Sequence, residues 1–255
     1  MRLHLEAFFC YTHFMREHTF IGDFDFSQKH FSIIDQGIIH QVHSVLRLKA
    51  GDLIVLHNGK GEAAHAEIAA VGHKILEVRI FSVASVLTEP SVQGILFCAV
   101  AKKDKFEWVV EKATEAGIVA IVPVITERTV KLSLNHERMR KIAKEASEQS
   151  GRGVVPYISE PLKLTDAMEQ ATKDAANIFF EKGAKRGLAD LFKFKSEFTE
   201  KSPHVGIFIG PEGGWSDKEI KDFVNAKYFG FNMGPRTLRT ETAAIIASFL
   251  ISAEV

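Results

Sequence analysis

Cysteine and long apolar runs are scarce in this sequence. Cys10 and Cys98 are the two cysteines among 255 residues, and they lie far apart between apolar neighbours. Two buried thiols in a reducing compartment are therefore expected rather than a disulfide framework. No stretch has the roughly 18 uninterrupted apolar residues that a membrane span needs, and the N-terminal residues mix charges and histidines with apolar side chains. We expect a cytoplasmic protein without a membrane or targeting segment.

An excess of charge of either sign is also missing. Lys plus Arg and Asp plus Glu number 32 each, so the formal net charge at pH 7 is zero. A polyanion would not be attracted by net charge, and a nucleic-acid partner would have to meet a local basic surface. The eleven histidines are scattered, and His40 with His43 lacks the carboxylate or cysteine partners of a metal site. We expect no bound metal.

The pattern of apolar residues changes near Thr88, where Thr-Glu-Pro-Ser interrupts it. Before this break, residues 53–68 predict two strands joined by an Asn-Gly turn, and residues 74–86 predict a further strand. Apolar residues at helical spacing over 38–48 predict a helix that packs across these strands. This pattern is typical of a small antiparallel barrel, which we assign to residues 1–88.

From residue 89 onward, predicted strands alternate with predicted helices. This alternation indicates an α/β domain with a mostly parallel sheet covered on both faces, which we assign to residues 89–255. Strands are expected at 94–101 and 119–125, near Val155, and at 177–182, 204–209 and 227–233. Helices are expected at 105–116, 136–149, 165–171, 188–194, 216–226 and 240–252.

Two glycine-containing loops near the C-terminus share one layout. The loops 210–214 and 234–240 each follow a predicted strand and run into a predicted helix. Ligands bind at the carboxyl ends of strands in open parallel sheets, and glycine lets a flat ring or a ribose approach the backbone. Neither loop has the spacing of a dinucleotide fingerprint or a P-loop, which favours a nucleoside-like ligand such as S-adenosylmethionine. Ordinary strand-to-helix turns are the alternative, with Ser216 and Glu219 forming a capping box.

Two long segments surround these loops, IGPEGGWSDKEI and MGPRTLRTETAAIIASFL. They resemble the C-terminal signatures of the ribosomal small subunit methyltransferase E family, the 16S rRNA (uracil-1498-N3)-methyltransferases. The resemblance continues upstream, in the family's order, through HQVHSVLRLKAGDLIVLHNGKG, KKDKFEWVVEKATEAGI, PVITERTV and KIAKEASEQSGR. Small departures are His57-Asn58-Gly59 in place of Phe-Asp-Gly and Glu115-Ala116-Gly117 in place of Glu-Leu-Gly; these concern packing and RNA contacts.

The resemblance implies a fold and partners that the residue pattern alone does not give. It implies that residues 1–88 form a barrel similar to PUA-like RNA-binding domains, and that 89–255 form a SPOUT-class methyltransferase domain with a C-terminal trefoil knot. It also implies S-adenosylmethionine as cofactor, 16S rRNA or the small ribosomal subunit as substrate, and a homodimer. The apolar helix 240–252 suits either a buried core or an obligate interface.

The resemblance also carries over site residues. Those implied to bind the cofactor are Ile209, Gly210, Glu212, Gly213, Met233, Gly234, Leu238, Arg239 and Thr240. Uracil N3 carries a proton in neutral uridine, so a proton acceptor or a group that stabilises the uracil anion is needed. Glu212 or Glu241 could accept the proton, and Arg239, Arg236, Arg128 or Arg152 could stabilise the anion. A carboxylate in the first turn of any helix is stabilised by the helix dipole, so a purely structural Glu241 remains open.

RNA would be held mostly through its phosphates, so the candidates are cations in the implied motifs. They are Arg47, Lys49, Lys102, Lys105, Arg128 and Arg152. The segment 128–152 is locally basic, although a solvated helix face has the same composition. We expect Trp108 to lie in the core rather than to stack on a base. The rival functions are a SPOUT methyltransferase acting on another ribosomal or transfer RNA base, and a non-catalytic RNA-binding protein, against which the intact glycines argue.

Overall fold

A computed structural model describes residues 18–100, 103–129, 134–171, 176–199 and 204–253 of the chain. The predictions for Cys10 and Lys102 lie outside these residues. The chain divides into two compact units, one formed by residues up to Thr88 together with Gly151–Val154, the other by Glu89–Ser150 and Val155–Val255. Within the described ranges, no helix is long and apolar enough to cross a membrane.

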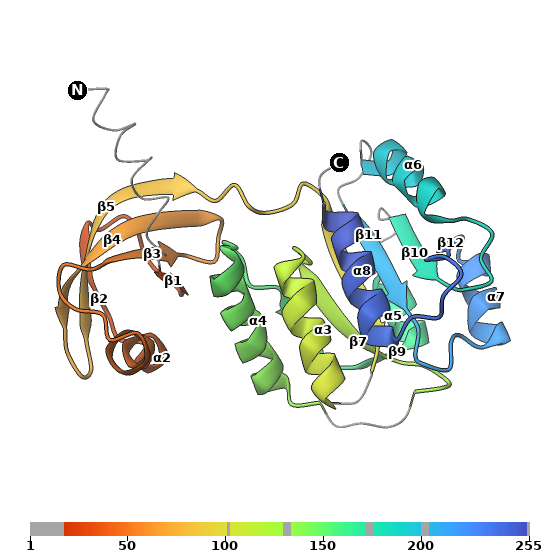
Figure 1. Cartoon of the computed structure of the whole chain (residues 1–255), viewed down its shortest axis with the longest axis horizontal. Coiled ribbons are helices and arrows are strands. Elements are labelled where there is room, and N and C mark those ends of the chain that lie inside the picture. The colour runs from red at the N-terminus through yellow and green to blue at the C-terminus, as the bar shows by residue number, and fades with distance from the viewer. Residues whose placement is uncertain (1–17, 101–102, 130–133, 172–175, 200–203, 254–255) are drawn as a thin grey trace. The chain divides into compact units, whose positions relative to one another are not determined.

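The first unit is built on a five-stranded sheet (Figure 1). Its strands, in spatial order, are β1 (His18–Ile21), β3 (Leu53–His57), β4 (Glu62–Val71), β5 (Leu76–Ser85) and β2 (His30–Ile33). The β3–β4 hairpin and β5 confirm the predicted strands, and Gly59 (φ 71°) and Gly61 (φ 90°) provide the left-handed turn. The sheet is mixed rather than purely antiparallel, because β1 pairs with β3 in parallel. A turn motif predicts an antiparallel hairpin, whereas parallel strands are joined by a long connection. No local motif therefore indicates the parallel β1–β3 pair.

The predicted helix of this unit is confirmed, with different bounds. It begins as α2 (Gln36–His40) and continues as a π-helical turn, η2 (Gln41–Val45). The Asp35 carboxylate caps it by accepting hydrogen bonds from the first turn, and Arg47, with φ 55°, follows its end. The core that the helix shares with the sheet includes Ile38, Ile39, Val42, Ile54, Leu56, Ala64, Ile68, Leu76 and Val78.

The second unit contains the predicted parallel sheet. The main strand order is β12 (Phe229–Phe231), β10 (Ala176–Phe180), β11 (His204–Ile209), β6 (Gln93–Ala99), β7 (Ala120–Ile125) and β8 (Tyr157–Ile158), and β9 (Leu162–Lys163) also pairs with β7. All of these pairs are parallel. β9 was not predicted, because two residues are too few to show a period.

Helices cover both faces of this sheet, as the alternation predicted (Figure 1). The helices that contribute to the core on one face are α3 (Lys103–Glu115), α4 (His136–Ser150), α6 (Leu188–Thr199) and α8 (Thr240–Ser252). Those on the other face are α5 (Leu164–Gln170) and α7 (Asp217–Asn225). Successive strand residues point to opposite faces, so Ile207 and Ile209 join the first core while Phe208 joins the second.

Two side-chain predictions have opposite outcomes. The capping box is confirmed, because Ser216 and Glu219 exchange side-chain to backbone hydrogen bonds at the start of α7. The prediction that Trp108 lies in the core is wrong, since 46% of its surface is exposed. Phe106, Val109 and their helical neighbours form the buried stripe of α3, and Trp108 lies on the opposite side of the helix.

Candidate functional site

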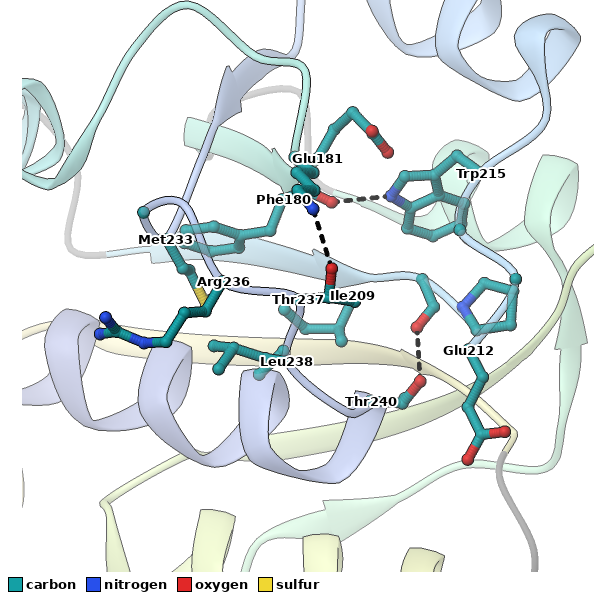
Figure 2. A pocket seen from close by; sticks show the side chains of 17 residues that line it. Phe180, Glu181, Ile209, Glu212, Trp215, Met233, Arg236, Thr237, Leu238 and Thr240 are labelled. Atoms are coloured by element: carbon teal, nitrogen blue, oxygen red, sulfur yellow. Dashed lines mark hydrogen bonds between the residues drawn. The ribbon is translucent and has the colours of Figure 1, made fainter.

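Three neighbouring strands of the second unit, β12, β10 and β11, end at the same edge of the sheet. The segments that leave their carboxyl ends enclose a cavity of about 270 Å³ (Figure 2). It is lined by Phe180, Glu181, Lys182, Ile209, Gly210, Pro211, Glu212, Gly213, Gly214, Trp215, Met233, Gly234, Arg236, Thr237, Leu238, Thr240 and Ala243. The two glycine loops therefore lie side by side around one cavity at the edge where a parallel sheet binds ligands.

The resemblance predicts nine cofactor-binding residues, and all of them except Arg239 line this cavity. The Arg239 side chain is exposed, and its backbone forms the N-cap of α8. Sequence reasoning missed the third wall, Phe180–Lys182, which follows β10. The signal was present, since a predicted strand ends there, but only the spatial order places β10 between β12 and β11.

Trp215 fixes the first glycine loop from beneath. Its ring is buried, and its Nε1 donates a hydrogen bond of 3.0 Å to the carbonyl oxygen of Phe180 (Figure 2). A Cβ added to Gly210 would lie 3.0 Å from the indole ring, closer than ordinary contact. Glycine at this position therefore lets the loop lie directly on Trp215, which also ties it to the third wall.

The second loop is fixed by its backbone and by two hydroxyl groups. Gly234 has φ +97°, a conformation that disfavours any other residue. Thr240 Oγ1 donates a 3.0 Å hydrogen bond to the carbonyl oxygen of Gly210, joining the two loops (Figure 2). Lys182 Nζ donates a 2.9 Å bond to Thr237 Oγ1, joining the third wall to the second loop. Hydrogen bonds therefore connect all three walls of the cavity.

The segment after β7 supports the first loop from outside. Arg128 Nη1 donates hydrogen bonds to the carbonyl oxygens of Gly213 (2.6 Å) and Trp215 (3.2 Å). Glu219 adds a second link, because its Oε1 accepts a 2.9 Å bond from the backbone N–H of Glu127. Arg128, a candidate for contact with RNA or with the uracil, is therefore engaged by the loop itself.

Three charged groups meet at the rim of the cavity. Lys105 Nζ lies 2.8 Å from Glu212 Oε1 and 3.4 Å from Glu241 Oε1. The hydrogen bond to Glu212 raises the pKa of Lys105, with a further contribution from Glu241. Cys98 is buried, as predicted, and forms no disulfide within the described ranges; burial together with the charge of Glu241 raises its thiol pKa to about 12. Cys98 is therefore a protonated, unreactive thiol at neutral pH.

The remaining candidates for RNA contact differ in exposure. Arg47 and Lys49 are exposed on the first unit, where a phosphate could reach them. Arg152 is only 2% exposed, which does not favour the phosphate contact predicted for it. On α4, Arg138 Nε lies 2.8 Å from a carboxylate oxygen of Glu107. In the ranges that the structure describes, no three His, Cys, Asp or Glu side chains are grouped to hold a metal ion.

Comparison with protein families gives two matches. Residues 88–252 match the model of an RNA methyltransferase domain, and residues 44–81 match that of an RNA methyltransferase PUA domain. Among curated proteins, the ribosomal RNA small subunit methyltransferase E of Bacillus subtilis is 29% identical over 221 residues, covering 84% of this chain and 86% of the relative. The Rickettsia conorii protein of the same name is 32% identical over 214 residues, covering 82% and 84%.

Solved structures share the fold. A candidate methyltransferase from Legionella pneumophila, solved with bound S-adenosylmethionine, has a TM-score of 0.81 and 28% identity, covering 93% of this chain and 97% of that one. A ribosomal RNA small subunit methyltransferase E from Neisseria gonorrhoeae, also bound to S-adenosylmethionine, has a TM-score of 0.80 and 24% identity, covering 91% and 95%.

Proposed function

Because the chain belongs to the ribosomal RNA small subunit methyltransferase E family, we propose that it transfers the methyl group of S-adenosylmethionine to N3 of one uridine of 16S rRNA, the equivalent of position 1498. The coarser function, methylation of ribosomal RNA with S-adenosylmethionine, follows from the family. For this chain, the main support for the proposal is that the two glycine loops line one and the same cavity.

The cavity fits the cofactor in size and chemistry. Its volume of about 270 Å³ lies just below the usual range of small-molecule sites, roughly 300 to 1,000 Å³. Ile209, Met233 and Leu238 offer apolar surface for an adenine ring, and the glycines leave backbone groups open to a ribose. Lys182 is a cation that could pair with the carboxylate of the methionine part.

The cofactor supplies a methyl group on a sulfonium, which is already an activated electrophile. The protein must therefore mainly align the uracil nitrogen for in-line attack, and such alignment can contribute roughly 7 to 11 kcal/mol. The N3 proton must also leave, and we favour Glu212 over Glu241 as its acceptor. Glu212 lines the cavity with 64% of its side chain exposed, whereas the Glu241 side chain is 6% exposed. Arg236 lines the cavity and is favoured over Arg239 to stabilise the uracil anion.

Further parts of the proposal come with the family. The first unit would hold RNA through phosphates, with Arg47 and Lys49 as exposed contacts. A cytoplasmic homodimer with a knotted C-terminal segment is proposed as well. What supports the dimer is the outer side of α8, where Ile246 and Phe249 leave large apolar side chains exposed.

Primer extension on ribosomal RNA tests the reaction and its position together. Methylation of N3 removes a Watson–Crick donor, so reverse transcriptase should stop one nucleotide before the modified uridine. We expect this stop in cells that carry the intact gene, its loss when the gene is deleted, and its return on complementation. A stop at another ribosomal position, or label from S-adenosylmethionine appearing in transfer RNA instead, would contradict the proposed target.

A further inference from the structure

An ion cluster joins three distant segments at the rim of the cavity. Lys105 lies in the first turn of α3, Glu212 in the first glycine loop, and Glu241 in the first turn of α8. The ammonium of Lys105 lies 2.8 Å from one carboxylate and 3.4 Å from the other. One lysine therefore connects the loop that lines the cavity to the helix that follows the second loop.

Loss of the ion pair between Lys105 and Glu241 would destabilise the protein, because Glu241 is buried. Its side chain is 6% exposed, and its Oε2 is buried without a hydrogen-bond partner among the residues that the structure describes. In the described part of the chain, the ion pair with Lys105 is the one that Glu241 makes. Removing one partner of a buried ion pair leaves an uncompensated charge, which destabilises the local structure strongly. Without Lys105, the start of α8 would have to rearrange or admit water.

The loop itself depends on the same ammonium. Contacts from Thr240, Trp215 and Arg128 reach the loop at Gly210 and Gly213, on either side of Glu212. The Glu212 side chain extends from the middle of the loop (Figure 2), and its carboxylate accepts a hydrogen bond from Lys105 at the rim of the cavity. Lys105 thus holds the middle of the loop, between those two fixed ends.

We propose that Lys105 is a positioning residue for the cofactor site, holding the loop 210–214 against the start of α8, and is not an RNA contact. This inference rests on the proposed function, because it takes the cavity as the S-adenosylmethionine site. Charge supports it: one ammonium and two carboxylates leave the cluster with a net negative charge, which repels phosphate. Exposure supports it as well, since 21% of the Lys105 side chain is exposed.

The first test is Lys105→Met, with Lys112→Met as matched control. Lys112 lies on the same helix and makes an ion pair of the same length, 2.8 Å, to Glu115. We expect Lys105→Met to raise the dissociation constant for S-adenosylmethionine in calorimetric titration by about tenfold, the scale of one charged hydrogen bond. The control should bind as wild type does. Affinity for 16S rRNA at fixed salt should be unchanged in both; a selective loss of RNA affinity in Lys105→Met would overturn the proposal.

Glu241→Gln separates positioning from stability. In the Lys105→Met background it removes the unpaired buried charge, so the melting temperature should recover. Cofactor affinity should stay below that of Glu241→Gln alone, because the loop has still lost its link to Lys105. If Lys105→Met alone does not fold, the comparison of the double variant with Glu241→Gln still tests the positioning role. Equal cofactor affinity in Glu241→Gln and in the double variant would overturn the proposal.

S-adenosylhomocysteine, the neutral product, distinguishes geometry from charge. A positioning role predicts that Lys105→Met weakens the cationic cofactor and the neutral product by the same factor. Weakening of only one of the two would show that Lys105 acts through its electric field and would overturn the proposal. Failure of the wild-type protein to bind either ligand would instead refute the proposed function. A wild type that binds, with a Lys105→Met variant that binds equally well, would refute only the positioning role.

Discussion

The two glycine loops look alike in sequence but are held in place differently. The loop 210–214 is fixed from outside by the side chains of Trp215, Arg128 and Lys105. In the loop 234–240, the Gly234 N–H donates a hydrogen bond to Asn232 Oδ1 at 3.0 Å, and Gly234 has φ +97°; Gly214 in the first loop is left-handed too, at φ +69°. Substitutions at Lys105 and Arg128, which are far from the loop 210–214 in the chain, should therefore disturb the first loop, whereas a change at Gly234 should disturb the second.

The largest effect is expected from Trp215→Ala. This change removes a buried ring that contacts Gly210, hydrogen-bonds to Phe180 and packs edge-on to Phe223 at 4.8 Å between ring centroids. The free energy of unfolding should fall by about 3 to 5 kcal/mol. Urea denaturation measures this change.

Trp108→Ala is the matched control, because it removes the same side chain from an exposed position. Its effect should stay within about 0.5 kcal/mol. Equal losses in the two variants would show that the first loop does not depend on its tryptophan.

A smaller effect is expected from Gly234→Ala. An alanine at φ +97° is strained whatever the space around it, and such strain costs about 1 to 3 kcal/mol. The loop should relieve it by moving, which would lower cofactor affinity in calorimetric titration. Gly187→Ala is the control, since its added Cβ meets no atom of the described residues within 4 Å and its φ is not in the left-handed range. If the Gly234→Ala variant bound the cofactor as tightly as the wild type, the conformation of Gly234 would not be needed to hold the second loop in place.

The smallest effect is expected from Arg128→Met, which keeps the length of the side chain. It removes the hydrogen bonds to the carbonyl oxygens of Gly213 and Trp215, worth about 1.5 to 3 kcal/mol when the donor is charged and less where solvent replaces it. We expect about a fivefold loss of cofactor affinity, with no change in the salt dependence of RNA binding. If the variant instead bound the cofactor normally but its RNA affinity depended less steeply on salt concentration, Arg128 would be a phosphate contact.

The repeating elements of the second unit were predictable, because each is long enough to show its period. Alternating strands and helices implied a parallel sheet, and the glycines marked the loops at its edge. The sequence could not reveal the strand order, so the wall at Phe180–Lys182 was missed. The same is true of pairings between distant residues: Lys105 and Glu212 are 107 positions apart, and no local pattern joins them.

Exposure was harder to predict than secondary structure. Trp108 was placed in the core on the strength of its residue type, although the stripe of apolar neighbours on α3 points to the other side. Arg152 was a candidate for contact with RNA, yet it is buried. In both positions the helix face or the tertiary packing decides, and a single residue's chemistry does not.

A crystal structure of the chain with S-adenosylmethionine tests the central claim most directly. The account predicts that the adenosine part lies between the segments 209–215 and 233–240, in contact with main-chain atoms of both. An adenosine bound elsewhere on the protein, or held by only one of the two loops, would contradict it.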